Sequence, residues 1–180
     1  ANPATGAVTG PDGSQPTLPS LLLTPISAHF AGRVVADRGP YLLVEPSRPY
    51  RLLDAVAGVY ADMWTSPQAS IDVYDPSLGP KVDLRLARPI APSGTVATIE
   101  IAPLELAPDG TSATGPVVST QTVEVAGTDE VPVSMPALKR PYRVTITSQS
   151  PFSPTSVGLE DSRSLGVIVH ATTGPTVLIP

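Results

Sequence analysis

Side chains that could act as nucleophiles or general bases are few in this sequence. There is no cysteine, and the only histidines are His29 and His170. No Gly-x-Ser-x-Gly, Ser-x-x-Lys or His-Glu-x-x-His motif occurs, and there is no glycine-rich phosphate loop. A histidine in an all-β chain is more often a hydrogen-bonded structural residue than a general base. The sequence therefore predicts no catalytic residues, and the lack of thiols excludes cysteine catalysis and thiolate metal sites.

Carboxylates are more numerous, and three close pairs could bind calcium through their oxygen atoms. The pairs are Asp72 with Asp75, Asp129 with Glu130, and Glu160 with Asp161. Such pairs are also typical of solvated turns. The metal site is therefore left unassigned, and we expect no cofactor, with a structural calcium ion as the alternative. Glycoside hydrolysis would need two acids about 5–10 Å apart across a cleft, and the pattern singles out no such pair.

The most distinctive local feature surrounds the only tryptophan, Trp64. It lies in a short polar and aromatic stretch that begins at Tyr60 and ends at Gln68. An indole at a loop can stack on the apolar face of a sugar ring. Asp62 and Gln68 would then bond sugar hydroxyls, and Tyr60 would add a second aromatic face. The alternative is that Trp64 closes one end of the core and binds nothing.

A second feature combines opposite charges ahead of an apolar run. Asp161 precedes Arg163 by two residues, and the run Leu-Gly-Val-Ile-Val begins at Leu165. An acid and an arginine at this spacing predict a charge-assisted pair that fixes a loop. The same groups could bond sugar hydroxyls, so Asp161 and Arg163 join the candidate carbohydrate-binding residues, although the structural role is favoured.

The composition predicts short strands joined by turns. The chain has 180 residues with 23 prolines and 14 glycines, which leave few windows long enough for a helix. Its net charge of −5 and scattered arginines argue against a nucleic-acid partner and against docking to anionic lipid. No apolar run approaches the roughly 18–20 residues of a membrane helix. Any membrane association would therefore come through a parent chain.

Alternation identifies the strands that must position these side chains. In Lys81–Ala87 the apolar Val82, Leu84 and Leu86 alternate with charged residues, as in a strand buried on one face. The same period predicts strands at 69–74, 95–101, 117–125 and 142–147, and apolar runs without clear alternation predict strands at 30–36, 40–45, 52–60 and 164–170. Pro-Asp-Gly sequences at 11–13 and 108–110 predict turns. The fold class is therefore all-β, an antiparallel two-sheet β-sandwich that is jelly-roll-like.

We predict one sandwich domain over residues 29–180. Residues 1–28 are rich in proline and read as an extended segment packed on the body, held by Leu21 to Leu23 as an edge strand or clasp. The chain begins at Ala1 without a signal-like leader, so we expect either a mature product or a piece of a longer protein.

Two motifs resemble β-sandwich modules of bacterial cell-envelope glycosyltransferases. The first motif is carried by Tyr60, Asp62, Trp64, Pro67 and Ala69, with Met63 at a position where glycine is expected. The second is carried by Phe152, Pro154, Asp161, Arg163, Leu165, Gly166 and Val167. The usage of alanine, proline, threonine and valine resembles that of high-GC actinobacteria. In arabinosyltransferase-like proteins of that group, such domains are extracytoplasmic, lie at the C-terminus and are thought to hold glycan.

The resemblance implies a non-catalytic carbohydrate-binding or acceptor-positioning domain of a cell-envelope glycosyltransferase. Its implied partner is an envelope polysaccharide such as arabinan, and its implied location is extracytoplasmic, in the periplasm or at the cell surface. Catalysis would then belong to the parent protein. The alternative is a structural or protein-interaction β-sandwich module of a surface or secreted assembly, for which an exposed apolar edge at Leu21–Leu23 would be the sign.

Overall fold

The computed structural model describes residues 6–10, 12–14, 16–17, 20–106, 112–174 and 176–179, and strands make up more than half of these residues. Two 3-10 turns, η1 (Pro76–Leu78) and η2 (Pro154–Val157), are the only helical elements among the described residues. The strands are β1 (Leu22–Pro25), β2 (Ala28–Phe30), β3 (Gly32–Arg38), β4 (Tyr41–Pro46), β5 (Leu52–Val59), β6 (Thr65–Val73), β7 (Lys81–Arg88), β8 (Thr95–Leu106), β9 (Ser112–Thr114), β10 (Ser119–Val125), β11 (Gly127–Pro136), β12 (Tyr142–Ser148), β13 (Ile168–Thr173) and β14 (Thr176–Ile179).

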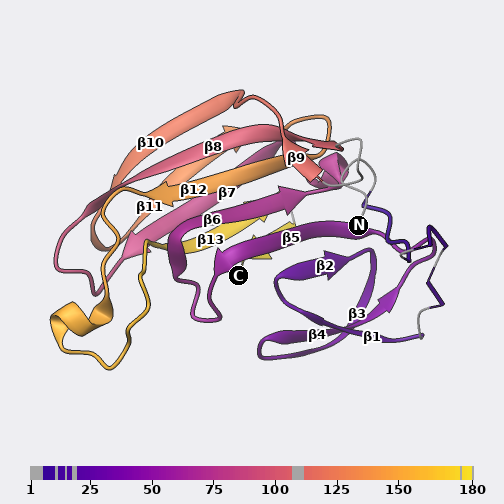
Figure 1. Ribbon diagram of the computed structural model, residues 1–180, viewed down its shortest axis with the longest axis horizontal. Coiled ribbons are helices and arrows are strands. Elements are labelled where there is room, and N and C mark those ends of the chain that lie inside the picture. Colours follow the sequence, from indigo (N-terminus) through magenta and orange to yellow (C-terminus); the bar gives the residue numbers. More distant parts are fainter. Residues whose placement is uncertain are drawn as a thin grey trace.

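Two antiparallel sheets form the sandwich, which confirms the predicted fold class (Figure 1). The larger sheet has seven strands in the order β10-β8-β12-β6-β5-β2, with β9 paired to β8. The smaller sheet has the order β11-β7-β13-β14. Strands close in sequence often belong to different sheets, as β7 and β8 do, so the chain crosses repeatedly between the two layers.

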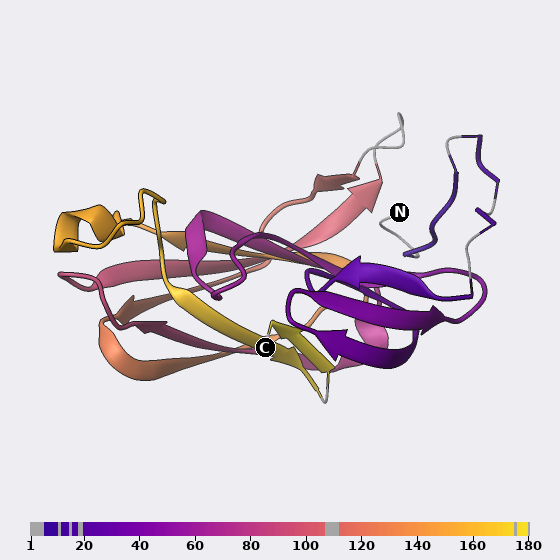
Figure 2. The same ribbon diagram turned by 90° about the horizontal axis from the view of Figure 1, so that it is seen from below.

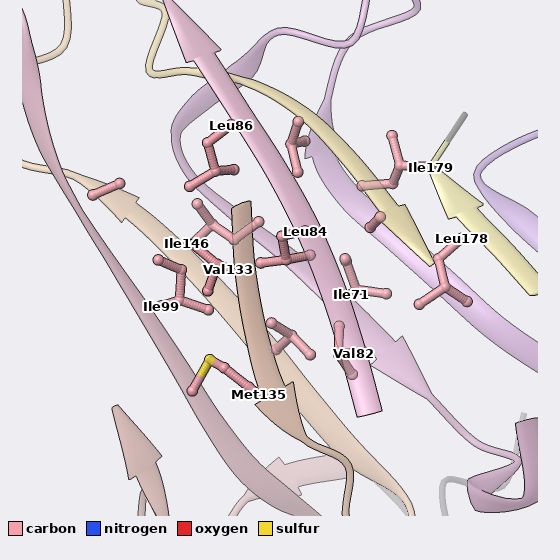
Figure 3. Close-up of a cluster of buried hydrophobic side chains, with 14 of the residues drawn as sticks. Ile71, Val82, Leu84, Leu86, Ile99, Val133, Met135, Ile146, Leu178 and Ile179 are labelled. Carbon is pink, nitrogen blue, oxygen red and sulfur yellow. The ribbon is translucent and has the colours of Figure 1, made fainter. Parts of the chain in front are cut away.

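The core lies between these two sheets and follows from the alternation in the sequence. Along β7, Val82, Leu84 and Leu86 are buried while Lys81, Asp83 and Arg85 are exposed. Partner side chains come from the other layer, with Ile71, Ile99 and Ile146 among them (Figure 3). Each such side chain contributes about 1.5–3 kcal/mol when it is fully buried. The core therefore consists mainly of branched aliphatic side chains, as the small number of aromatic residues requires.

A third sheet, which the sequence did not predict, lies beside β5 and β2 at one edge of the seven-stranded sheet (Figure 1). It has the order β1-β4-β3 and is called the small sheet below (Figure 2). Its inner face buries Leu42 and Val44. A cavity of about 160 Å³ separates it from the sandwich, and apolar side chains such as Ile26, Val56 and Leu178 line this space.

The N-terminal segment meets the body through backbone bonds. The Leu52 amide donates to the Gly6 carbonyl oxygen at 2.7 Å, and the Val8 amide donates to the Tyr50 carbonyl oxygen at 3.1 Å. Further along the segment, β1 is an edge strand of the small sheet, whereas β2 already belongs to the seven-stranded sheet. Of the predicted turns, Pro11 and residues 107–111 lie outside the described residues.

Several predicted strands differ from the observed strands at their ends, and two of the differences from the prediction have identifiable causes. The run at 164–170 becomes a strand only from Ile168, because Leu165 forms an isolated bridge with Phe152 and the Gly166 amide donates to the Thr65 carbonyl oxygen. Strand β11 was not predicted, since two prolines and two adjacent acids interrupt its apolar pattern. It forms the edge of its sheet, where proline is tolerated.

Candidate functional site

The loop between β5 and β6 is a tight hairpin that turns at Tyr60–Trp64. The Tyr60 amide donates to the Trp64 carbonyl oxygen at 2.8 Å, and the Met63 amide donates to the Tyr60 carbonyl oxygen at 2.9 Å. Met63 has φ +64°, and it is the only described residue other than glycine with positive φ. A three-residue hairpin loop calls for a left-handed residue here, usually glycine. This geometry explains why glycine was expected at the position that Met63 occupies.

Trp64 is buried, so it does not offer the exposed indole face that stacking on a sugar ring would require. Its side chain is 6% exposed and belongs to a small apolar cluster with Phe152 and Leu165. The Trp64 and Phe152 rings meet edge to face with centroids 5.5 Å apart. The bridge between Phe152 and Leu165 brings both residues under the indole. The indole therefore presents no free face on which a sugar could stack, and it packs in a small apolar cluster separate from the main core.

Arg163 gathers four of the predicted site residues into what we call the Arg163 cluster: Tyr60, Asp62, Asp161 and Arg163. Its guanidinium donates to both carboxylate oxygens of Asp62, at 3.1 and 2.6 Å, and to both of Asp161, at 2.7–3.0 Å. It also lies 4.6 Å from the centre of the Tyr60 ring. The hydrogen bonds from Arg163 lower the pKa of Asp62 and of Asp161, and they raise the pKa of Arg163 itself.

The contacts of the Arg163 cluster link two segments of the chain and have a structural character. Asp62 and Arg163 are 101 residues apart in sequence, and their pairing ties the β5–β6 hairpin to the loop before β13. The two carboxylates take up nearly all of the guanidinium donors, and the guanidinium covers one face of Tyr60. Few of these groups remain available to a ligand, so the geometry favours the structural role predicted for the charged pair.

Two predicted site residues are not members of the Arg163 cluster: Trp64, which packs against Tyr60, and Gln68, which lies elsewhere. It is exposed on β6, on the outer face of the seven-stranded sheet. There it borders a hollow of about 330 Å³, which we call the polar hollow. The polar side chains that line the polar hollow are Gln68, Ser70, Glu100, Thr114, Arg143 and Thr145.

Strand pairing explains why the polar side chains of the hollow converge. Ser70 on β6 is opposite Thr145 on β12, and Thr145 is opposite Glu100 on β8. Their neighbours Ile71, Ile99 and Ile146 point into the core, so all three polar side chains project from the outer face. Small residues, among them Ala57 and Ala102, leave the space between them open.

The groups of the polar hollow differ from the Arg163 cluster in their remaining hydrogen-bonding capacity. Arg143 forms a bidentate pair with Asp72 at 2.6 and 2.8 Å, which raises the pKa of Arg143. The Glu100 carboxylate, by contrast, makes no hydrogen bond or ion pair with the residues that the structure describes. A half-buried carboxylate beside hydroxyl and amide groups is suited to accept bonds from a polar ligand. Sequence reasoning placed Glu100 and Thr145 on strands but had no signal that these strands are neighbours.

The two histidines lie on different sheets, His29 on β2 and His170 on β13. His29 Nδ1 lies 2.7 Å from Asp54 Oδ1, and Asp54 is fully buried. This hydrogen bond raises the pKa of His29, and burial raises the pKa of Asp54. His170 lies on β13 beside Asp83, Arg85 and Glu130 on the outer face of the four-stranded sheet.

The acidic pairs proposed for calcium are engaged otherwise where the contacts are known. Asp72 binds Arg143, Asp75 accepts bonds from the Ser77 amide and hydroxyl, and Asp161 binds Arg163. Within the part of the chain that the structure describes, no three histidine, aspartate or glutamate side chains come together in a way that could hold a metal ion.

Comparisons of the chain with protein-family models, with curated proteins and with solved structures found no match. The described residues also include no helix with the length and apolar character needed to span a membrane.

Proposed function

We propose that this chain is a non-catalytic carbohydrate-binding domain whose ligand lies in the polar hollow. The observation that carries the proposal is the Glu100 carboxylate, which is half-buried at the hollow and has no partner among the described residues. The Glu100 oxygens are not among the fully buried polar atoms, so a ligand hydroxyl can bond to them by displacing water alone.

A polyhydroxylated ligand suits this surface better than an apolar or strongly charged one. Hydroxyl groups both donate and accept, and the hollow offers acceptors from Glu100, donors from Arg143, and hydroxyls from Ser70 and Thr145. A volume of about 330 Å³ is at the small end of ligand pockets. None of the described residues that line the hollow is aromatic. We therefore expect weak affinity, with a Kd of about 0.1–1 mM.

The resemblance described above supplies the proposed setting. In that setting the domain is the extracytoplasmic, C-terminal part of an actinobacterial cell-envelope glycosyltransferase, it holds a polymer such as arabinan, and the parent chain provides catalysis and membrane attachment. Within the second motif, Leu165 and Val167 are buried and Asp161 pairs with Arg163, so these residues have structural roles in this chain.

The test is a titration of the ¹⁵N-labelled chain with arabinan oligosaccharides, followed by NMR. Amide shifts should cluster at Ser70, Glu100 and Thr145, and Glu100→Gln should weaken binding about tenfold. Glu124→Gln is the matched control, because Glu124 is an exposed acid on β10 outside the hollow and its change should leave binding unaltered.

Two outcomes would contradict the proposal. Shifts that cluster at Tyr60 and Asp62 would place the ligand at the Arg163 cluster instead. The absence of shifts with arabinan, galactan and mannan oligosaccharides at millimolar concentration would remove carbohydrate binding altogether. The protein-interaction alternative would then be the stronger candidate, because Leu21 and Leu23 are exposed beside an edge strand.

A further inference from the structure

The outer face of the small sheet exposes an unusual number of large apolar side chains. Leu23 is paired with Leu43, and Tyr41 lies on the same face of β4 two residues away. Leu23 is 66% exposed and Tyr41 50% exposed, and Leu21 is exposed two residues before Leu23. Monomeric proteins seldom leave such side chains contiguous on one sheet, so this face has the character of an interface.

The two edges of the small sheet differ in their charge. Residues 13–32, which include β1, contain no aspartate, glutamate, lysine or arginine. Strand β3 carries Arg33, Asp37 and Arg38, and its pairing with β4 is interrupted by a bulge between Val34 and Ala36. Charges and bulges are the usual protection of an edge strand. The charged side chains of this face are therefore confined to β3 and to Glu45 on β4.

Those charges lie at opposite ends of the apolar face. Arg38 is opposite Tyr41 at one end, and Arg33 is opposite Glu45 at the other. The Arg33 guanidinium donates to Glu45 at 2.7 and 3.1 Å, whereas Arg38 has no ion pair with any residue that the structure describes. Tyr41 and Glu45 are four residues apart on β4, which corresponds to about 13 Å along the strand.

The charges on this face allow two copies of the chain to be complementary to each other. If two copies meet face to face about a two-fold axis that runs perpendicular to the strands, the Arg38 end of each lies over the Glu45 end of the other. An axis parallel to the strands would instead oppose Arg38 to Arg38. The charges therefore select the first arrangement, in which Leu23 and Leu43 are covered and each Arg38 gains a carboxylate partner.

We propose that the outer face of the small sheet is the contact surface of a weak symmetric dimer of this chain, with Arg38 of one copy paired to Glu45 of the other. Three strands of about six residues present an area of about 14 by 20 Å. Two such faces bury less than the roughly 1,200 Å² of a stable complex. The dimer should accordingly form only at high micromolar concentration or above. The inference does not depend on carbohydrate binding.

Analytical ultracentrifugation from about 10 µM to 1 mM, without glycan, is the test. The chain should show concentration-dependent dimerisation. Leu23→Glu should weaken it at least about tenfold, because it places a charge on the apolar face. Val177→Glu is the matched control, since Val177 is exposed on β14 in the four-stranded sheet and its change should leave association unaltered. Circular dichroism establishes that each variant is folded.

A charge exchange separates this dimer from other modes of association. Arg38→Glu alone and Glu45→Arg alone each place like charges at both contacts of the homodimer, so each variant should be monomeric. An equimolar mixture of the two restores opposite charges at both contacts and should dimerise. A chain that stays monomeric to 1 mM would overturn the proposal. So would a mixture that fails to associate, or an association that Leu23→Glu abolishes but the charge changes leave intact, because the contact would then run through the open edge of β1.

Discussion

Removal of the Trp64 ring should destabilise the fold without weakening carbohydrate binding. The side chain is 6% exposed, and an indole that is buried to this degree removes about 220 Å² of apolar surface from water. At roughly 25 cal/mol per Å², and after a reduction of 10–40% for a compact unfolded chain, the loss is about 3–5 kcal/mol. This agrees with the usual cost of about 3–5 kcal/mol for replacing a buried tryptophan by alanine. We therefore expect Trp64→Ala to lower the free energy of unfolding by about 4 kcal/mol.

Urea unfolding followed by far-ultraviolet circular dichroism measures this change, since the variant lacks the fluorescent probe. Tyr41→Ala is the control, because Tyr41 is half exposed and its loss should cost less than about 1 kcal/mol. A double-mutant cycle with Phe152→Leu should give a coupling of about 1 kcal/mol for the edge-to-face contact. A Trp64→Ala change that costs less than about 1.5 kcal/mol, together with lost glycan binding, would refute the structural role of the indole.

Two further predictions concern charged groups. Hydrogen bonding to Asp54 raises the pKa of His29 above 6.5, so the stabilisation from this pair is complete below that pH and is lost as the pH rises through the folded-state value. Urea unfolding between pH 6 and 8.5 should show stability falling for the natural chain and a flatter profile for His29→Gln; equal slopes would contradict the assignment. Arg163→Met should lower the midpoint of thermal unfolding more than Arg33→Met does, because Arg163 joins two carboxylates and an aromatic ring while Arg33 forms one exposed pair. If the two variants lowered the midpoint of thermal unfolding equally at low salt, the Arg163 cluster would not be an important stabilising contact.

The sandwich could be predicted because its strands carry a clear period of two. Strand β7 extends one residue beyond its predicted end, and β12 likewise, since each alternates without interruption. The small sheet could not be predicted. Its strand β3 is exposed along nearly its whole length, so no pattern of burial marks the layer to which it belongs. The third sheet depends on how the chain folds back at Ser27 and Gly39, and a single sequence does not contain that information.

The candidate site shows a different limit. The sequence analysis assigned Asp62 and Arg163 to the same candidate carbohydrate site although they are 101 residues apart. The structure does place these two residues in contact. The sequence could not reveal that Trp64 lies beneath them, because an aromatic residue in a polar loop has the same pattern whether it points outward or inward. Nor could the sequence identify Glu100 as a candidate binding residue, because the polar hollow beside it forms only when β12 and β6 lie next to β8.

A comparison of Arg163 with Glu100 indicates how a binding group can be distinguished from a structural one. Both are charged, both project from loops or strands near the surface, and both have polar neighbours. Arg163 has bonded nearly all of its donors to two carboxylates, so a ligand would have to displace existing bonds and would gain little. The Glu100 carboxylate makes no such bonds with the described residues, so a ligand hydroxyl adds a bond and displaces only water. The proposed recognition site therefore lies at the polar hollow, where hydrogen-bonding capacity remains unused.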